Sequence, residues 1–451
     1  MAQTDQTSIS YFEKKQGMKK NYSIKIAVLL AITLSVAIIA GAYNKTGSAK
    51  EPSTTFANTA RIITGNTIND DNPKAGKWID SWATSFLSTT VMGATQFAPP
   101  FNNQTLRLNV YTKLGGTKVR VKLTNKFATN TLTVGAAHVA LQSEKNSIIE
   151  SSDRALTFGG KPGVTLEPGA EIWSDPVTLT VKQHVTVAIS VYVPDNFQPT
   201  TFHPTGLHTS YISATGNFVA VPTLPLASSG SITRGIVIVC GLQVWAPKKT
   251  KVAICFGNSI TDGAASANDV NGTWPDVLSS RIPVLPSGAP FSVINMGIGS
   301  NRIVSSDLAG PSGIHRFAED VLRRPNVAYL LILEGINDIS YEQATAADIT
   351  GAYASMVAQA HAKGIKVYGA TLLPIGNSRK YTVENEATRQ AINTWIRTPG
   401  NFDAVLDFEE VVKDPATNPL RIRSEWTGDY VHPNTAGYAA IGNSIPLSLF
   451  K

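Results

Sequence analysis

Five short apolar runs alternate with segments of helical periodicity after Lys249. The runs are Val252–Phe256, Ser292–Met296, Val327–Leu333, Lys366–Leu373 and Ala404–Phe408. Uniformly apolar runs of this length are typical of strands buried on both faces of a parallel sheet. The helical segments are Trp274–Ile282, Gly313–Arg324, Ala346–Lys363 and Glu384–Arg397, and a last helix is expected after Pro433. The pattern predicts a three-layer α/β domain over residues 248–451, with a doubly wound, five-stranded parallel sheet and right-handed crossovers.

The preceding residues, 75–247, have a different pattern. Thr105–Thr112 and Lys118–Thr124 alternate apolar and polar residues on either side of Gly115 and Gly116, which predicts a hairpin. Further strands are expected at Leu132–Leu141, Val177–Val181, Val185–Val193, Thr209–Ile212 and Ile232–Val239. Repeated short strands without a long amphipathic helix predict an all-β sandwich domain.

The N-terminal segment has the composition of an export signal. Ile26–Tyr43 carries no charge, lysines precede it, and it ends in the small residues Ala40, Gly41 and Ala42. We expect residues 1–42 to be a signal peptide or an uncleaved N-terminal anchor, with the start at Met1 or Met18, and residues 43–74 to be a flexible linker. The chain is therefore expected to be periplasmic or secreted, with membrane contact only through residues 26–43 if that segment is retained.

Charge and cysteine content exclude several classes of protein. The formal net charge is +7, but residues 1–25 alone carry +3, so the remainder gives little support to nucleic-acid binding. The only two cysteines, Cys240 and Cys255, exclude a disulfide scaffold and are expected as buried thiols. His203 and His208 lie close in sequence, but no cysteine or acid pair completes a metal site, so a structural or substrate-facing role is expected. No metal or cofactor is predicted.

Four polar clusters follow strands or lie near the C-terminus. Ser259 follows the first parallel strand, residues 295–302 the second and Asn337 the third, while Asp429 precedes His432 by three residues. Ligands in open α/β sheets bind beyond the carboxyl ends of the strands. Taken alone, each cluster has a structural explanation: a serine after a strand is often a helix N-cap, and an Asp-x-x-His sequence is often a local turn. Together the clusters supply a nucleophile, a base, an orienting acid and oxyanion donors.

These motifs resemble a known family. They are GNSITDG, NMGIGSNR, EGIND and GDYVHPNTAGY, and they resemble blocks I, II, III and V of the SGNH (GDSL-type) hydrolases over nearly all of residues 251–451. The resemblance implies a flavodoxin-like hydrolase fold with Ser259 as nucleophile, His432 as base and Asp429 as its orienting acid. It also implies an oxyanion hole formed by the backbone N–H groups of Ser259 and of Ser300 or Gly299, with the side-chain amide of Asn337.

The sequence departs from the family pattern at two positions. Asn258 stands where the family usually has aspartate, and Ser300 stands where it usually has a second glycine. A backbone amide survives a glycine-to-serine change, so the oxyanion hole is expected to remain intact.

A finer resemblance concerns the substrate. KWIDSWATS and LTFGGKPGVTLEPGAEIWSDPV, in the β domain, resemble the extracellular two-domain subgroup associated with xylan degradation. It implies a serine esterase that removes short acyl groups, chiefly acetyl, from carbohydrate. Arg302 is a candidate contact for a substrate oxygen, and the alternative is a structural salt bridge. Trp426 is a candidate pocket residue, and the alternative is a residue of the core. The alternatives are an acyltransferase or lipase that uses the same residues, or a glycan-binding protein with an inactive hydrolase domain.

Overall fold

The computed structural model describes residues 76–88, 99–232, 235–306 and 310–451, which belong to one compact unit that spans residues 68–451. The expected signal or anchor and most of the expected linker lie outside the described residues. Within the described ranges, no helix combines the length and the apolar character needed to cross a membrane.

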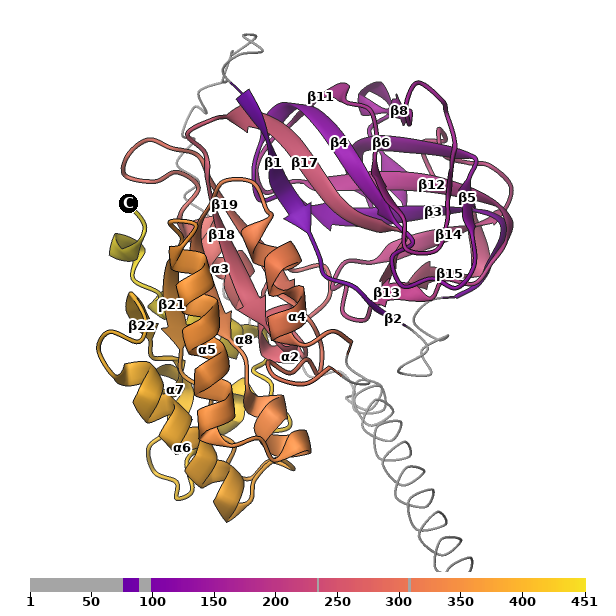
Figure 1. The fold of residues 1–451 in the computed structure, drawn as a ribbon. Coiled ribbons are helices and arrows are strands. Elements are labelled where there is room, and N and C mark those ends of the chain that lie inside the picture. The colour runs from indigo at the N-terminus through magenta and orange to yellow at the C-terminus, as the bar shows by residue number, and fades with distance from the viewer. Residues whose placement is uncertain (1–75, 89–98, 233–234, 307–309) are drawn as a thin grey trace, which may run out of the picture. The chain divides into compact units, whose positions relative to one another are not determined.

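The C-terminal part contains a five-stranded sheet in which every pair of neighbouring strands is parallel (Figure 1). Its order is β19-β18-β20-β21-β22. The strands are β18 (Lys251–Gly257), β19 (Phe291–Gly297), β20 (Val327–Leu333), β21 (Lys366–Ala370) and β22 (Ala404–Leu406). The predicted parallel sheet is confirmed. Because the first strand, β18, lies between the second and the third, the strand order reverses there, and the carboxyl ends of β18 and β20 form the place where such sheets bind ligands.

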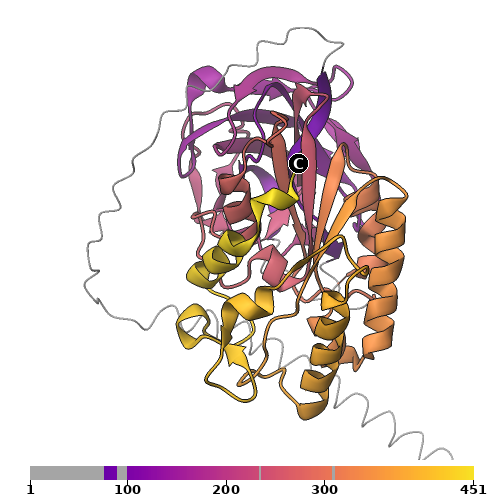
Figure 2. The ribbon, with the colours of Figure 1, turned by 90° about the vertical axis from the view of Figure 1, so that its left-hand side faces the viewer.

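Helices cover both faces of this sheet. Figure 2 shows α5 (Ala346–His361, orange) and α8 (Thr435–Ser444, yellow) on opposite faces. The helix α3 (Trp274–Arg281) packs against α8, whereas α6 (Val383–Arg397) packs against α5. These helices match the predicted segments closely.

One helical prediction needs correction, and another is confirmed. The expected helix Gly313–Arg324 is divided into α4 (Gly313–Phe317) and a π-helical turn over Ala318–Leu322. The last helix begins after Pro433, as expected. Asn434 is the N-cap, and its side chain accepts a hydrogen bond from the backbone of Gly437, so the helix begins after it.

The N-terminal part is a β-rich domain with two principal antiparallel sheets. The first has the order β1-β17-β4-β10, with β11 also paired to β4. The second has the order β15-β14-β3-β12-β6-β7, with β8 also paired to β6. The strands of the first sheet are β1 (Gly76–Ala83), β4 (Gly116–Thr124), β10 (Glu171–Trp173), β11 (Val177–Val181) and β17 (Val239–Pro247). Those of the second are β3 (Phe101–Tyr111), β6 (Ala136–Glu144), β7 (Ser147–Ile148), β8 (Arg154–Leu156), β12 (Thr186–Phe197), β14 (Ser210–Thr215) and β15 (Leu226–Ile232).

Alternation of side chains supplies the core of this domain. Val119, Val121 and Leu123 of β4 are fully buried, as are Val187 and Ile189 of β12. Side chains two residues apart point to the same face of a strand, so each sheet buries one row of them. Minor strands complete the element list: β2 (Leu87–Ser88), β5 (Leu132–Val134), β9 (Val164–Leu166), β13 (Thr201–His203), β16 (Ile236–Val237), β23 (Lys413–Asp414) and β24 (Arg421–Ile422).

The predicted hairpin across Gly115 and Gly116 is wrong. The strands on either side, β3 and β4, exist as expected, but they belong to different sheets. Alternation and a glycine turn identify strands but do not specify their partners, which here lie far along the chain. The expected strand Leu132–Leu141 is also divided, at Gly135: β5 pairs with β9, whereas β6 pairs with β12.

Polar contacts join the β-rich part to the α/β part. The strand β1 packs along β19, and the Ser292 hydroxyl donates to the carbonyl of Asp80. The Asp80 carboxylate, which is fully buried, pairs with Arg324, and Lys113 pairs with Asp276 of α3. The β strands therefore share a buried boundary with the sheet that carries the site.

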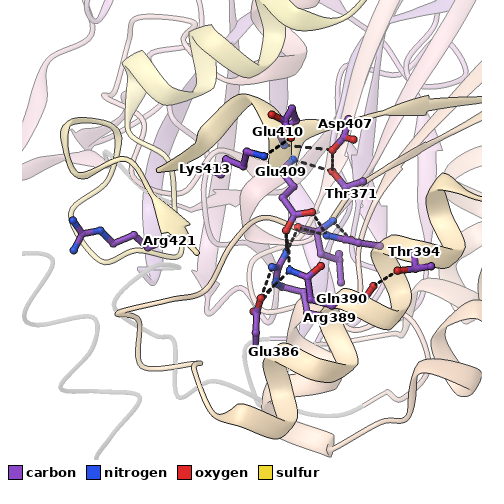
Figure 3. A network of polar contacts seen from close by, with 12 residues as sticks. Thr371, Glu386, Arg389, Gln390, Thr394, Asp407, Glu409, Glu410, Lys413 and Arg421 are labelled. Atoms are coloured by element: carbon purple, nitrogen blue, oxygen red, sulfur yellow. Dashed lines mark hydrogen bonds and ion pairs between the residues drawn. The ribbon is translucent and has the colours of Figure 1, made fainter. Parts of the chain in front are cut away.

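A network of ion pairs ties α6 to the short helix α7 (Phe408–Val412), as Figure 3 shows. Fully buried Arg389 pairs with Glu386 on its own helix and with Glu409 on α7. Arg389 also donates to the carbonyl of Leu372, just after β21. The segment that leads from β21 toward α6 is thereby fixed at its start.

Candidate active site

Ser259 is separated from the end of β18 by Asn258 alone, and it starts the four-residue helix α2 (Ser259–Asp262). The alternative interpretation of Ser259 was that of a helix N-cap. That role belongs to Asn258, whose side-chain oxygen accepts a hydrogen bond from the backbone N–H of Ile260 at 3.0 Å. The turn needs glycine at position 257, because an added Cβ would lie 2.3 Å from the carbonyl of Leu333. The backbone N–H of Ser259 belongs to the first helical turn, where no intrahelical acceptor exists.

The Ser259 hydroxyl faces the ring of His432, which comes from the loop before α8. The distance from Oγ to Nε2 is 2.9 Å, and the His432 side chain is largely buried. On the other side of the ring, Nδ1 lies 2.7 Å from Oδ2 of Asp429. The structure thus brings the three residues into one hydrogen-bonded chain.

Asp429 holds both the ring and the backbone of His432. Its Oδ1 accepts the backbone N–H groups of His432 at 2.8 Å and of Val431 at 2.9 Å. Burial raises the pKa of this carboxyl, but the bonds from His432 and Val431 outweigh that effect and hold the pKa well below its usual range. Asp429 is therefore an acceptor for Nδ1–H at any pH near neutrality.

The candidate oxyanion donors lie on two neighbouring loops. Asn337, after β20, is buried, and its Nδ2 donates to the carbonyl of Asn301 at 2.8 Å. Ser300, after β19, has a φ of +63°, the left-handed conformation that favours glycine, which is the residue that the resemblance led us to expect there. The neighbouring Gly299 is half-buried, and an added Cβ would lie 3.8 Å from Pro204 of the β domain.

Two residues that support these loops were missed by the sequence analysis. Asp338 accepts the backbone N–H groups of Ile303 and Val304, at 2.9 Å to Oδ1 in each case, so it fixes the loop after β19. Lys380 donates to Oδ1 of Asn337 at 2.8 Å. An aspartate after the asparagine of EGIND was visible in the sequence, but nothing in the pattern around Lys380 distinguishes it from other loop lysines.

A buried arginine joins three strand ends beneath the site. Arg316 of α4 donates to the carbonyls of Gly257 and Met296 and to the side chain of Asn301. It also lies 3.4 Å from the carboxylate of Glu334, at the end of β20. Burial raises the pKa of Glu334 to about 8, because the long contact with Arg316 does not offset desolvation.

The two candidate substrate contacts from the sequence have structural partners. Arg302 is buried, forms an ion pair with Glu342, and stacks over the ring of Tyr341. Trp426 is half-buried and packs against the hydrophobic core, with the guanidinium of Arg423 5.6 Å from its ring centroid. Both residues flank the site by sequence, and their contact with substrate stays a prediction.

His203 of the β domain forms a buried ion pair with Asp262, one turn beyond Ser259. Nε2 lies 3.0 Å from Asp262 Oδ1, and Nδ1 lies 2.9 Å from the carbonyl of Ser85. Burial lowers the pKa of His203, but Asp262 and the flanking carbonyls outweigh it, so the pKa is raised. Acceptors at both nitrogens fit only the protonated ring. The structural interpretation of His203 is therefore the one that the geometry supports.

A cavity of about 80 Å³ lies beside Asp262 of α2 and His203. His203, His208 and Asp262 line it, together with Tyr111 and Asp276, whereas Ser259 and His432 do not. The described part of the chain contains no group of three or more histidine, cysteine or acidic residues arranged to hold a metal ion. Cys240 and Cys255 are free and buried, as expected.

Comparisons with known proteins concern mainly the C-terminal part of the chain. Residues 255–440 match the model of the GDSL-like Lipase/Acylhydrolase family. No curated protein matches the chain.

Several solved structures also match this part of the chain. A GDSL-like lipase from Bacteroides thetaiotaomicron VPI-5482 is 22% identical, with a TM-score of 0.33, over 44% of this chain and 85% of that one. An aryl esterase from M. smegmatis, in its inhibitor-bound form, is 18% identical, with a TM-score of 0.34, over 43% and 95%. A carbohydrate acetylesterase from Sinorhizobium meliloti is 15% identical, with a TM-score of 0.35, over 43% and 96%. Such distant similarity bears on neither substrate nor mechanism. The match over residues 255–440 supports the assignment of this part of the chain to the GDSL-like lipase/acylhydrolase family.

Proposed function

We propose that this protein is a serine esterase that hydrolyses short acyl esters, with Ser259 as its nucleophile. The observation that carries the proposal is the hydrogen-bonded chain from Ser259 through His432 to Asp429 at the carboxyl end of a central parallel strand. A hydroxyl in contact with an imidazole, which is itself held by a carboxylate, is the arrangement that activates a serine for acyl transfer. The family match supports acylhydrolase chemistry.

The reaction proceeds through an acyl-enzyme. Nε2 of His432 accepts the Ser259 proton while Oγ attacks the ester carbonyl carbon. The carbonyl oxygen becomes an oxyanion, which the N–H groups of Ser259 and Ser300 and the amide of Asn337 stabilise. When the tetrahedral intermediate collapses, the leaving alkoxide takes the proton from His432. Water then repeats the sequence on the acyl group and regenerates Ser259.

Asp429 determines which nitrogen of His432 can act as the base. Its carboxylate accepts Nδ1–H, so Nε2 carries the lone pair that faces Ser259. When the ring becomes an imidazolium, the carboxylate also stabilises its charge. A metal ion has no step in this scheme.

We propose acetyl groups on carbohydrate as the substrate class. The support comes from the similarity of the β-domain segments around Trp78 and Thr157 to the xylan-associated subgroup. The β domain also approaches the site, since Pro204 and Thr205 lie by Gly299 of the oxyanion loop. A polysaccharide is too large to enter a cell, so this substrate fits the export expected from residues 1–42.

The experiment compares wild type and Ser259→Ala, as residues 43–451, on p-nitrophenyl acetate and on acetylated xylan. Ser444→Ala is a matched control, because its hydroxyl caps the end of α8 away from Ser259. The proposal predicts acetate release from both substrates by wild type and the control, and none by Ser259→Ala. Equal rates in all three variants contradict it. A sugar acceptor distinguishes hydrolysis from acyl transfer, and p-nitrophenyl esters of long fatty acids distinguish a lipase.

A further inference from the structure

We propose that Lys380 is a positioning residue of the oxyanion hole, whose ammonium group holds the Asn337 amide so that one of its N–H groups faces the developing oxyanion. Lys380 lies in the segment between β21 and α6, 43 residues after Asn337 in sequence. The inference rests on the proposed esterase function and names a residue that the Ser-His-Asp scheme does not contain.

The hydrogen bonds of Asn337 leave one orientation for its amide. Nζ of Lys380 lies 2.8 Å from Oδ1, and Nδ2 lies 2.8 Å from the carbonyl of Asn301. An ammonium group can only donate, and a backbone carbonyl can only accept. In the reversed amide, Nδ2 would face the ammonium group of Lys380, donor against donor, and Oδ1 would face the carbonyl of Asn301, acceptor against acceptor. Lys380 and Asn301 together specify which end of the amide carries the N–H groups.

This orientation leaves one donor available. The Nδ2 group carries two hydrogens, and Asn301 accepts one of them. The second is the donor that the proposed mechanism assigns to the oxyanion. The positive charge of Lys380, whose Nζ donates to Oδ1, polarises the Asn337 amide and strengthens its remaining N–H donor. Hydrogen bonds in series reinforce one another in a low-dielectric site.

Lys380 is itself held before any substrate arrives. The residue is 5% exposed, and Nζ lies 4.3 Å from the centroid of the Tyr341 ring, a cation–π contact. The backbone carbonyl of Lys380 accepts from Nδ2 of Asn385 at 2.9 Å, and its N–H donates to the hydroxyl of Ser378 at 3.2 Å. Burying a lysine in a fixed position lowers the stability of the folded protein. A role for the charge at the site gives a reason for this cost.

The charged groups around Lys380 make its protonation sensitive to pH. The pKa of Lys380 is lowered to about 7, chiefly by burial. The neighbouring charges of Arg379 and Arg302 also lower this pKa, whereas those of Asp429 and Asp338 raise it. The polarising charge is therefore present below neutral pH and is lost as the pH rises above it. This sensitivity gives the inference a signature that a purely structural lysine would not produce.

The first test is a double-mutant cycle on kcat with p-nitrophenyl acetate at pH 6.5. It uses Lys380→Met, Asn337→Ala and the double variant, with Lys413→Met as control, since Lys413 pairs with exposed Glu410 on the surface. We expect Lys380→Met to lower kcat about tenfold to a hundredfold with KM little changed, and the double variant to be no slower than Asn337→Ala alone. Wild-type kcat in Lys380→Met, or multiplicative losses in the double variant, overturns the inference.

The second test follows pH. The ratio of wild-type kcat to that of Lys380→Met should fall as the pH rises from 6 to 9, because groups shared by both proteins cancel. A ratio that stays constant overturns the inference. Should Lys380→Met fail to fold, Lys380→Gln takes its place in both tests. Because this variant keeps an N–H donor for Oδ1 and loses only the charge, it is expected to lower kcat less than Lys380→Met would, with the same pH trend.

The outcomes separate the two proposals. If wild type turns over no ester and Ser259 is unreactive, the proposed function fails, and the role of Lys380 fails with it. If wild type is active and Ser259→Ala is not, but Lys380 and Asn337 act independently, then only the inference about Lys380 fails.

Discussion

The Nε2 atom of His432 lies 2.9 Å from Oγ of Ser259, although 173 residues separate them in sequence. Ser259 is positioned by β18 and the turn after it, whereas His432 is positioned by the loop before the last helix. Each position is held independently, by the Asn258 cap in one case and by the Asp429 carboxylate in the other. The contact between them is therefore built into the folded chain before a substrate binds.

Asn337→Ala should lower kcat by about 10²–10³-fold with little change in KM, because it removes a donor used mainly in the transition state. Asn326→Ala is a matched control, since Asn326 precedes the opposite end of the same strand, β20, and its amide donates to Lys248 and Thr250. Steady-state kinetics on p-nitrophenyl acetate checks the prediction. Similar kcat values for Asn337→Ala and the control would show that the amide does not contact the oxyanion.

Asp429→Asn should lower kcat by about 10³–10⁴-fold while the fold is kept. The backbone N–H groups of Val431 and His432 would retain the amide oxygen, so the new NH₂ group would face Nδ1 of His432. Nδ1 would then become the acceptor and Nε2 would carry the proton, which leaves no base for Ser259. The same change at Asp414, which pairs with Arg421, should leave kcat unaltered. Full activity of Asp429→Asn would contradict this role of the carboxylate.

Many residues of this candidate site could be predicted from the sequence, and there are physical reasons why the others could not. Ser259 and His432 were identifiable because the motifs GNSITDG and GDYVHPNTAGY are short and local in sequence, and β20 was predicted with its observed bounds. The pairing of β3 and β4 was not, because alternation does not encode partners. Lys380 and the His203–Asp262 pair were also missed as interacting groups, since their environments arise only when distant segments fold together.

His203→Gln should flatten the pH dependence of stability. The raised pKa of His203 means that its contribution is fully present below about pH 6.5, the unfolded value, and is lost as the pH rises through the folded value. The free energy of unfolding of wild type relative to His203→Gln should therefore be larger at pH 5.5 than at pH 8.5. Urea titrations at the two pH values measure this difference, with His361→Gln, a half-exposed histidine paired with Asp403, as the control. An unchanged difference would mean that the ring is neutral.

Glu334→Gln should gain stability over wild type as the pH rises. The pKa of Glu334 is raised to about 8, so its contribution is present below the unfolded value near 4.3 and is lost as the pH approaches 8. Since a tenfold change in proton affinity corresponds to about 1.4 kcal/mol, the advantage of the variant should grow by more than about 1 kcal/mol between pH 5 and pH 8.5. Glu410→Gln, at an exposed ion pair, is the control in the same urea titrations. A parallel pH dependence for wild type and Glu334→Gln would refute the prediction.

The most direct test of the account is covalent labelling of the nucleophile with a serine-directed fluorophosphonate, followed by peptide mass spectrometry. We predict one label per chain, on Ser259, in wild type, much slower labelling in His432→Gln, and none in Ser259→Ala. Labelling of another serine, or equal labelling in wild type and Ser259→Ala, would contradict the claim that Ser259 is the activated nucleophile.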